Sequence, residues 1–265
     1  MHIVTITKST PDTAAPVEVD AAGNITWGDA PVVVNPWDEY AIEEALRLRE
    51  AHGGSVTVMA VGPELDNDAL KHGVAMGCDA PLRIWDDALD GADAFGLART
   101  AAAAIAQMDD VGLIITGKEA VDVNTDALHL GLARALGWPA LTFVSRIVAI
   151  DPEARTITVE RLIEEGRQVV ASRLPAVLSV VKDINEPRYP SFKGVRIAAR
   201  TEIPVRSLAD LGLSGDEVGG AAARTRRTAI YNPPQETVAL ELIEAGSAAE
   251  AASLLVDKLI AEGVV

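Results

Sequence analysis

Residues 35–61 read NPWDEYAIEEALRLREAHGGSVTVMAV, and this stretch decides the fold class. Asn35-Pro36 is typical of a helix start. Asparagine can accept a hydrogen bond from the unpaired backbone N–H groups of the first turn, and proline at the first position costs no hydrogen bond, because that N–H has no partner in the helix. Apolar residues then recur every three or four positions, which predicts a helix that ends at Gly53-Gly54. The apolar run from Val56 to Val61 follows directly and is typical of a buried strand.

The same alternation extends along the first half of the chain. Apolar runs predict further strands at residues 3–7, 82–85 and 113–116, and helical spacing predicts helices at 67–77 and 93–108. Asn67 and Asp93 are the expected N-caps of these two helices. Strands that alternate with helices form right-handed β-α-β units, so we predict an α/β fold with a mainly parallel, doubly wound sheet.

Ligands of such sheets bind beyond the carboxyl ends of the strands. The predicted ends lie after Thr7, Val61 and Thr116. The loop 117–126 follows the third of them, where Gly117 permits close backbone approach and Lys118 offers a charge. Asn124, Thr125 or Asp126 could cap the next helix, whose N-terminus would attract an anion. The residues leave open whether this loop binds a nucleotide or phosphate or is only solvated.

Two parts of the chain depart from this pattern. Residues 17–19 and 25–27 predict a β-hairpin after the first strand, and residues 147–150, 156–161 and 169–172 predict an antiparallel section before an apolar strand at 176–181. Residues 207–235 lack clear periodicity, and residues 247–262 form an amphipathic helical pattern. We expect this C-terminal part to be an arm that needs a surface to bury itself on.

Composition excludes several classes of protein. Hydrophobic residues make up 49% of the 265 residues, which excludes intrinsic disorder for most of the chain. A net charge of −16 makes nucleic acid and anionic lipid poor partners. No apolar run reaches the length of a membrane span, and the N-terminus lacks the pattern of a signal peptide. With the single cysteine Cys78, which we expect to be packed inside, this favours the cytoplasm.

No residue pattern predicts catalysis. The stretch from Gly112 to Glu119 resembles a phosphate-binding P-loop, but the residues between its glycines are strand, and Glu119 replaces the required Ser or Thr. The four histidines show no metal-ligand spacing, so we expect surface or helix positions for them. Arg224, Arg226 and Arg227 form a basic cluster that either docks a partner or is solvated. These absences favour a binding protein or a carrier over a self-sufficient enzyme.

Several segments together resemble the β subunits of electron transfer flavoproteins, over about residues 1 to 205. The segments are, in the order of that family, Asn35 to Leu46, Ala75-Met76-Gly77 with Asp79 shortly after, the loop Gly117 to Asp122, the set Val159-Glu160-Arg161, Glu164-Glu165-Gly166, Gln168 and Leu174-Pro175-Ala176-Val177, and Asn185-Glu186-Pro187-Arg188-Tyr189. Several ordered motifs are far more specific than any one of them.

The resemblance implies a fold similar to that of the adenine nucleotide α-hydrolases, with an antiparallel hairpin section and a C-terminal arm. It implies a non-enzymatic subunit of a heterodimer, whose α subunit holds most of the redox-active FAD while this subunit buries an AMP. Such a pair accepts electrons from acyl-CoA or related dehydrogenases and passes them to a quinone-linked oxidoreductase. Residues 1–205 would form the nucleotide-binding domain, with a recognition loop at about 185–200, and residues 206–265 would form the arm and helix that pack on the α subunit.

Site residues follow from the resemblance by position. The implied AMP contacts are Ile6, Asn35, Pro36, Trp37, Asp38, Val61, Gly117, Lys118, Glu119, Ala120, Val121, Asp122, Val123, Asn124, Thr125, Asp126, Ala127 and Leu128. Arg188, Tyr189 and Phe192 would contact the dehydrogenase. Phe192 stands where the family commonly has a leucine that fills a pocket on the dehydrogenase, and the alternative for it is an ordinary packed side chain.

Departures from the family pattern leave the occupant of the nucleotide site open. Branches that bifurcate electrons bind a second FAD, and their loop resembles D-G-D-T-A-Q-V-G. In this chain Val123 and His129 replace two of those glycines, which disfavours a second FAD. Glu119 and Asp126 add negative charge where a phosphate would arrive, so AMP or an empty site are the alternatives.

Two other classes of function remain as alternatives. An adenylating or pyrophosphate-releasing enzyme of the same general fold would need a glycine-rich loop after the first strand, and Lys8-Ser9-Thr10-Pro11-Asp12 has no glycine. A nucleotide-sensing module without a redox role would lack both a flavin and an α partner.

Overall fold

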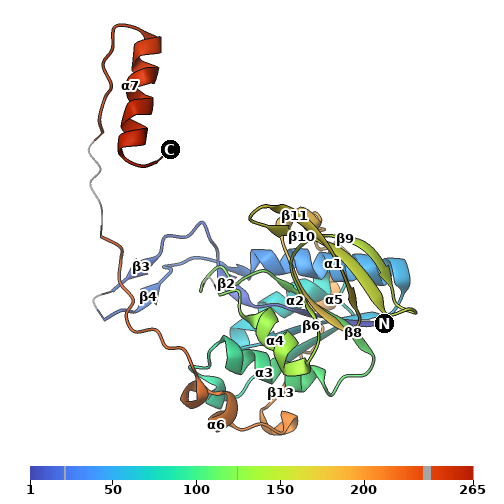
Figure 1. Cartoon of the computed structure of the whole chain (residues 1–265). Helices are drawn as coiled ribbons and strands as arrows, with labels where there is room; N and C mark the ends of the chain where they lie inside the picture. The colour runs from blue at the N-terminus through green and yellow to red at the C-terminus, as the bar shows by residue number, and fades with distance from the viewer. Residues whose placement is uncertain (21, 124, 235–239, 265) are drawn as a thin grey trace. The chain divides into compact units, whose positions relative to one another are not determined.

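The computed structural model describes residues 1–20, 22–123, 125–234 and 240–264. The chain forms two compact units, Met1–Ile230 and Tyr231–Val265, which are described separately. Figure 1 shows the helices and strands of both.

One large sheet forms the centre of the first unit. Among the described residues it has nine strands, in the order β11-β10-β9-β12-β8-β1-β6-β7-β13. Their bounds are β1 His2–Ile6, β6 Ser55–Val61, β7 Ala80–Ile84, β8 Val111–Gly117, β9 Ala140–Asp151, β10 Thr156–Ile163, β11 Gly166–Arg173, β12 Ala176–Val180 and β13 Val205–Arg206. The strands from β12 to β13 in this order run parallel, as the alternation of strands and helices predicts.

Helices cover both faces of this sheet (Figure 1). Helices α1 (Pro36–His52) and α2 (Asn67–Met76) pack in one core cluster, and α3 (Ala94–Ile105) and α4 (Leu128–Leu136) pack in another. Neighbouring residues of one strand enter opposite clusters, for example Ile3 and Val4 of β1. Side chains of a strand alternate between faces, so a strand covered on both sides is apolar throughout. The prediction of a doubly wound α/β fold is confirmed.

The antiparallel section occurs where the sequence predicts it, but its first strand, β9, begins at Ala140 and not at Ile147. Strand β9 pairs parallel with β12 and antiparallel with β10, and β10 pairs antiparallel with β11. Two small sheets follow β1, formed by β2 (Ser9–Pro11) with β5 (Val32–Val34), and by β3 (Glu18–Val19) with β4 (Ile25–Thr26). The second of these is the predicted hairpin.

The boundary of the first unit lies later than the expected residue 205. After the short 3-10 helix η3 (Lys182–Ile184), helix α5 (Phe192–Ala198) and β13, the chain forms η4 (Ala209–Leu211), α6 (Gly215–Val218) and η5 (Gly220–Ala222). Leu208 and Val218 are buried in a cluster with Leu89 of η2 (Asp87–Leu89). The first unit extends to Ile230, and Leu208 and Val218 help to form a third, smaller core cluster within it.

The second unit contains the predicted C-terminal helix, α7 (Ala248–Ala261). Ser247 caps it by accepting a bond from the Glu250 N–H. No residue of this helix is buried, and Lys258 pairs with Glu241. Its apolar residues are thus available to a partner.

The predicted helix caps are only partly correct. Asp93 caps α3 by accepting bonds from the N–H groups of Phe95 and Gly96. Asn35 makes no cap bond, and Asn67 is the first residue of α2, after η1 (Glu64–Asp66), and not its cap. Helix α4 begins after Ala127, so neither Thr125 nor Asp126 caps it, and Asn124 lies outside the described residues.

Candidate functional site

A cleft of about 1350 Å³ lies at the carboxyl ends of β1, β6 and β8. Ile6, Val61 and Thr116 line it at these three strand ends. In the sheet, β6 lies on one side of β1 and β8 lies on the other, so the strand order reverses at β1. A crevice at such a reversal of strand order is where open α/β sheets bind ligands.

Asn35 fixes the loop that follows β8 to the start of α1. Its side chain is buried, its Nδ2 donates to the Glu119 carbonyl at 2.9 Å, and its Oδ1 accepts from the Val121 N–H at 3.2 Å. The cap bond that the sequence predicts is absent because the amide is used for this longer connection. The loop therefore has a defined place beside the cleft.

Gly117 brings the end of β8 against the first turn of α1. A Cβ at this position would lie 2.6 Å from the Asp38 Oδ1 and 2.7 Å from the backbone carbon of Trp37. We expected this glycine to allow a ligand to approach the backbone. The structure shows instead that the close approach is made by the protein's own helix.

Both lysines of the cleft are paired with carboxylates. The Lys8 Nζ lies 2.7 Å from the Asp122 Oδ2, and the Lys118 Nζ lies 3.0 Å from the Glu119 Oε1. The Lys118 Nζ also lies 4.5 Å from the ring centre of Trp37, close enough for a cation–π contact. The other oxygen of Asp122, Oδ1, is buried without a hydrogen-bond partner among the described residues. A buried acceptor of this kind is suited to a donor on a ligand.

Two carboxylates near Lys8 are buried. Asp38 accepts from the Lys8 N–H at 3.2 Å, and Asp66 accepts from the Ser9 N–H at 2.7 Å. Burial raises the pKa of Asp38 to about 7, against the opposing effect of hydrogen bonds and of Lys8. Burial also raises the pKa of Asp66. The floor of the cleft thus holds carboxyl groups that lose their proton at a higher pH than usual.

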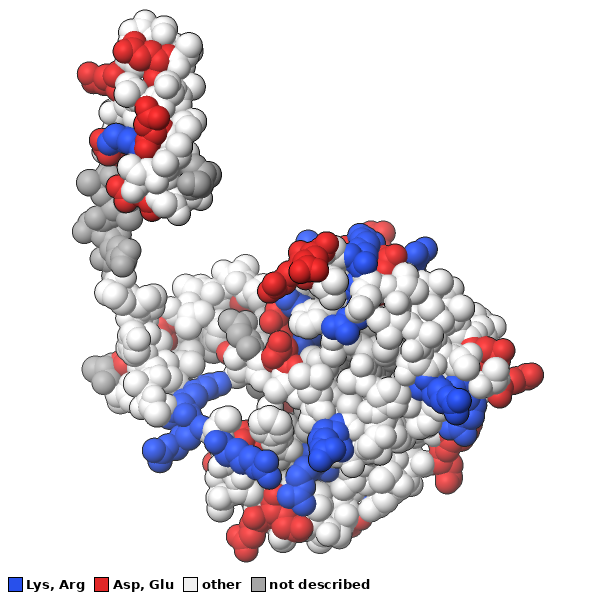
Figure 2. All heavy atoms as spheres, in the orientation of Figure 1, with Lys and Arg blue, Asp and Glu red and all other residues white. Residues whose placement is uncertain are grey.

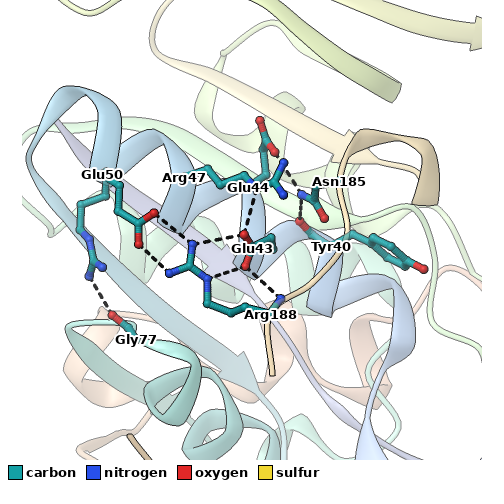
Figure 3. Close-up of polar contacts among 9 residues, drawn as sticks. Tyr40, Glu43, Glu44, Arg47, Glu50, Gly77, Asn185 and Arg188 are labelled. Carbon is teal, nitrogen blue, oxygen red and sulfur yellow. Dashed lines mark hydrogen bonds and ion pairs between the residues drawn. The ribbon is translucent and has the colours of Figure 1, made fainter. Parts of the chain in front are cut away.

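The segment after β12 is exposed beside α1. Tyr189 and Phe192 have 96% and 95% of their surface exposed. The alternative of an ordinary packed Phe192 is therefore wrong. Arg188 differs from them, because its guanidinium forms ion pairs with Glu43 and Glu50 of α1, as Figure 3 shows.

Comparison with known proteins identifies the family. The model of the electron transfer flavoprotein domain matches residues 28–211, more than half of the chain. The electron transfer flavoprotein subunit beta of Mycobacterium tuberculosis is 33% identical over 100% of this chain and 99% of its own. This chain belongs to the electron transfer flavoprotein β subunit family. It is therefore an electron carrier subunit, not a catalytic enzyme, and its partner is an α subunit.

Other relatives of the electron transfer flavoprotein family agree with this assignment. The subunit beta of Megasphaera elsdenii is 30% identical over 100% of both chains. The protein FixA of Azotobacter vinelandii is 34% identical over 92% of this chain and 88% of its own. Membership of the family implies flavin and nucleotide cofactors.

Most of the predicted nucleotide contacts of this flavoprotein subunit do line the cleft. They are Ile6, Asn35, Asp38, Val61, Gly117, Lys118, Glu119, Ala120, Asp122, Val123, Thr125, Asp126 and Leu128. Pro36, Trp37, Val121 and Ala127 do not line it, and Asn124 lies outside the described residues. Pro36 and Trp37 lie in the first turn of α1, and Val121 and Ala127 lie between residues that do line the cleft, so position in sequence did not separate lining residues from their neighbours.

Part of the cleft lining was not predicted. It includes the start of α3 and the segment 224–227, and we call this segment the arginine strap. The Asp93 Oδ2 accepts bonds from the N–H groups of Arg224 and Thr225 at 2.7 and 3.1 Å, while Oδ1 caps α3. Figure 2 shows Lys and Arg side chains grouped around the segment that follows α6 in Figure 1. The arginine cluster was visible in the sequence, but its place at the cleft was not.

Further residues complete the description of the cleft and the core. His129 lines the cleft and is buried on α4, where burial lowers its pKa. Cys78 is packed as predicted, and burial raises the pKa of its thiol to about 12.

Within the described residues, no group of three side chains suits a metal ion, and none of the helices has the length and apolarity to cross a bilayer.

Proposed function

We propose that this subunit binds AMP in the cleft at the ends of β1, β6 and β8, and that its α subunit holds most of the FAD. The observation that carries the nucleotide assignment is the buried, unpartnered Oδ1 of Asp122 beside the Lys8 pair. A ribose hydroxyl can donate to this oxygen. The arginine strap supports the proposal, because it lines the same cleft and its guanidinium groups can bind a phosphate.

Side chains along the loop favour AMP over a second FAD. Val123 lines the cleft at a position where the loop of the bifurcating branches has a glycine, and Asp126 lines it where that loop has an alanine. The glycine positions of that loop allow a larger ligand to approach the backbone. A bifurcating subunit with a second FAD is therefore the second candidate.

We further propose that the heterodimer accepts electrons from an acyl-CoA or related dehydrogenase and passes them to a quinone-linked oxidoreductase. The exposure of Tyr189 and Phe192 supports a docking role for the segment at about 185–200. An exposed aromatic side chain that enters a pocket of the partner is a typical hot spot of a protein interface. A cytoplasmic location is part of the proposal, because the one cysteine, Cys78, forms no disulfide.

The test is to purify the heterodimer and count FAD and AMP per complex after denaturation. We expect one of each, and we expect Asp122→Ala to lose the AMP and keep the FAD. Asp68→Ala, an exposed position on α2 that does not line the cleft, is the matched control and should keep both. Two FAD would support the bifurcating candidate, and one FAD without AMP would contradict the nucleotide assignment.

A further inference from the structure

Arg188 is half-buried and is bound by two carboxylates of α1 (Figure 3). Its Nε lies 2.7 Å from the Glu43 Oε2, and its Nη1 lies 2.6 Å from the Glu50 Oε1. Its backbone N–H also donates to the Glu43 Oε2 at 3.2 Å. Glu43 and Glu50 are about two helical turns apart and therefore lie on one face of α1. The planar guanidinium can bind both at once.

The hydrogen bonds from Arg188 lower the pKa values of both carboxylates, Glu43 and Glu50. Only 4% of the Glu43 side chain is exposed, and burial alone would raise its pKa. Hydrogen bonds from Arg188 and Arg47 outweigh burial, so the pKa of Glu43 is lowered. The hydrogen bond from Arg188 also lowers the pKa of Glu50. Removing Arg188 would leave Glu43 with Arg47 alone, at 2.9 Å.

The same segment has two more attachments. Before Arg188, the Asn185 Nδ2 donates to the Tyr40 carbonyl and to the Glu44 Oε2, each at 3.0 Å. After it, α5 packs on the end of α2 so closely that a Cβ on Gly194 would lie 2.1 Å from the Ala75 carbonyl oxygen. The segment is thus fastened on both sides of Tyr189 and Phe192, whose side chains remain exposed.

We propose that Arg188 is a positioning residue, which holds Tyr189 and Phe192 in their docking geometry through Glu43 and Glu50 and does not itself touch the dehydrogenase. This replaces the expectation that Arg188 is a contact residue, and it rests on the proposed docking function. A side chain already held in its bound conformation loses less entropy when it binds. The ion pairs therefore act on the binding step and not on electron transfer within the bound complex.

A double-mutant cycle tests this in the intact heterodimer. We would measure steady-state flavin reduction by a fixed, catalytic amount of a purified acyl-CoA dehydrogenase at increasing concentrations of the heterodimer, for wild type, Arg188→Gln, Phe192→Ala and the double variant. We expect Arg188→Gln to raise KM about three- to tenfold with kcat unchanged. Because Arg188 acts through Tyr189 and Phe192, Arg188→Gln should raise KM by a smaller factor in the Phe192→Ala background than in wild type. Additive effects would show that Arg188 contacts the dehydrogenase directly and would overturn the proposal.

Arg47→Gln is the matched control. Arg47 also pairs with Glu43 but comes from α1 itself, so its loss does not release the segment. We expect its KM to equal that of wild type. Reduction by dithionite should be the same in every variant, which shows that the heterodimer and its flavin are intact.

Hydrogen exchange separates this proposal from the docking function. Amides of residues 189–198 should exchange faster in Arg188→Gln than in wild type or Arg47→Gln. If Phe192→Ala leaves KM unchanged, the docking function fails, and faster exchange would still support the positioning of the segment. If exchange in Arg188→Gln equals that of wild type, the positioning role is wrong.

Discussion

At the level of one residue, the fold changes the pKa of Asp38. It lies in the first turn of α1 and lines the cleft, yet its side chain is buried. Its pKa is raised from 3.8 to about 7, chiefly because burial disfavours the charged form. Between these values the folded chain keeps a proton that the unfolded chain has lost. The free energy of unfolding therefore falls as the pH rises through this window.

Asp38→Asn should remove this dependence. Between about pH 5 and pH 7, the wild type should lose up to about 2–3 kcal/mol more stability than the variant, at about 1.4 kcal/mol for each pH unit. Thermal unfolding midpoints of the heterodimer at both values measure the difference. Glu44 and Asp66, whose pKa values are raised by burial, have the same sign but are present in both proteins. Equal pH dependence of the two proteins would show that Asp38 is ionised throughout this range.

At the level of elements, α1 positions both candidate sites. Its N-terminal end holds the cleft loop through Asn35, and its later turns hold the docking segment through Glu43, Glu44 and Glu50. A helix is rigid over this length, so the two sites have a fixed separation within the first unit. These contacts account for the buried polar residues Asn35, Glu43 and Glu44 in the stretch that decides the fold class.

The arginine strap is the second element with a testable role. The cleft lysines are paired with Asp122 and Glu119, whereas among the described residues Arg224, Arg226 and Arg227 have no ion pair. Replacing Arg226 and Arg227 together by glutamine should lower AMP affinity about tenfold and make it less sensitive to salt. Calorimetric titration of the heterodimer at two ionic strengths measures both effects.

Arg134→Gln is the control for the strap. Arg134 is an exposed arginine on α4 that does not line the cleft, so its loss changes the net charge without changing the proposed site. Adenosine should bind the strap variant as it binds wild type, because it has no phosphate. Unchanged AMP affinity would mean that the phosphate is bound elsewhere in the cleft.

On the scale of the whole molecule, the first unit contains its own cores. All buried residues of the three clusters precede residue 219, and α7 has none. Leu254, Leu255 and Ile260 of α7 are exposed. Apolar residues gathered on one exposed helix indicate a protein-binding surface. We propose that residues 231–265 bind the α subunit.

Deletion of residues 231–265 should leave the first unit folded and abolish the heterodimer. Circular dichroism measures the first effect, and size-exclusion chromatography of the co-expressed subunits measures the second. Leu255→Asp with Ile260→Asp in the full-length chain is the gentler variant, and it should weaken association at least tenfold by placing charges in an apolar interface. A truncated chain that still elutes with the α subunit would contradict this role.

The sequence by itself determined the alternation of strands and helices. The signals for this alternation are local, and each depends only on neighbours in the chain. They include the N-cap Asp93 of α3, Gly53-Gly54 at the end of α1 and the apolar run Val56 to Val61. The three predicted strand ends correctly located the cleft, because parallel sheets have one edge at which loops meet. The family resemblance likewise depended on ordered local motifs.

Only the tertiary structure decided which polar groups meet. Lys8 pairs with Asp122 across 114 positions, and Arg188 pairs with Glu43 across 145. Arg224 reaches Asp93 across 131 positions, which places the strap at the cleft. No periodicity encodes such pairs, because each depends on how the crossovers and the sheet order bring distant segments together. For the same reason Asn35, a good cap by its local sequence, instead binds a loop that the fold places beside it.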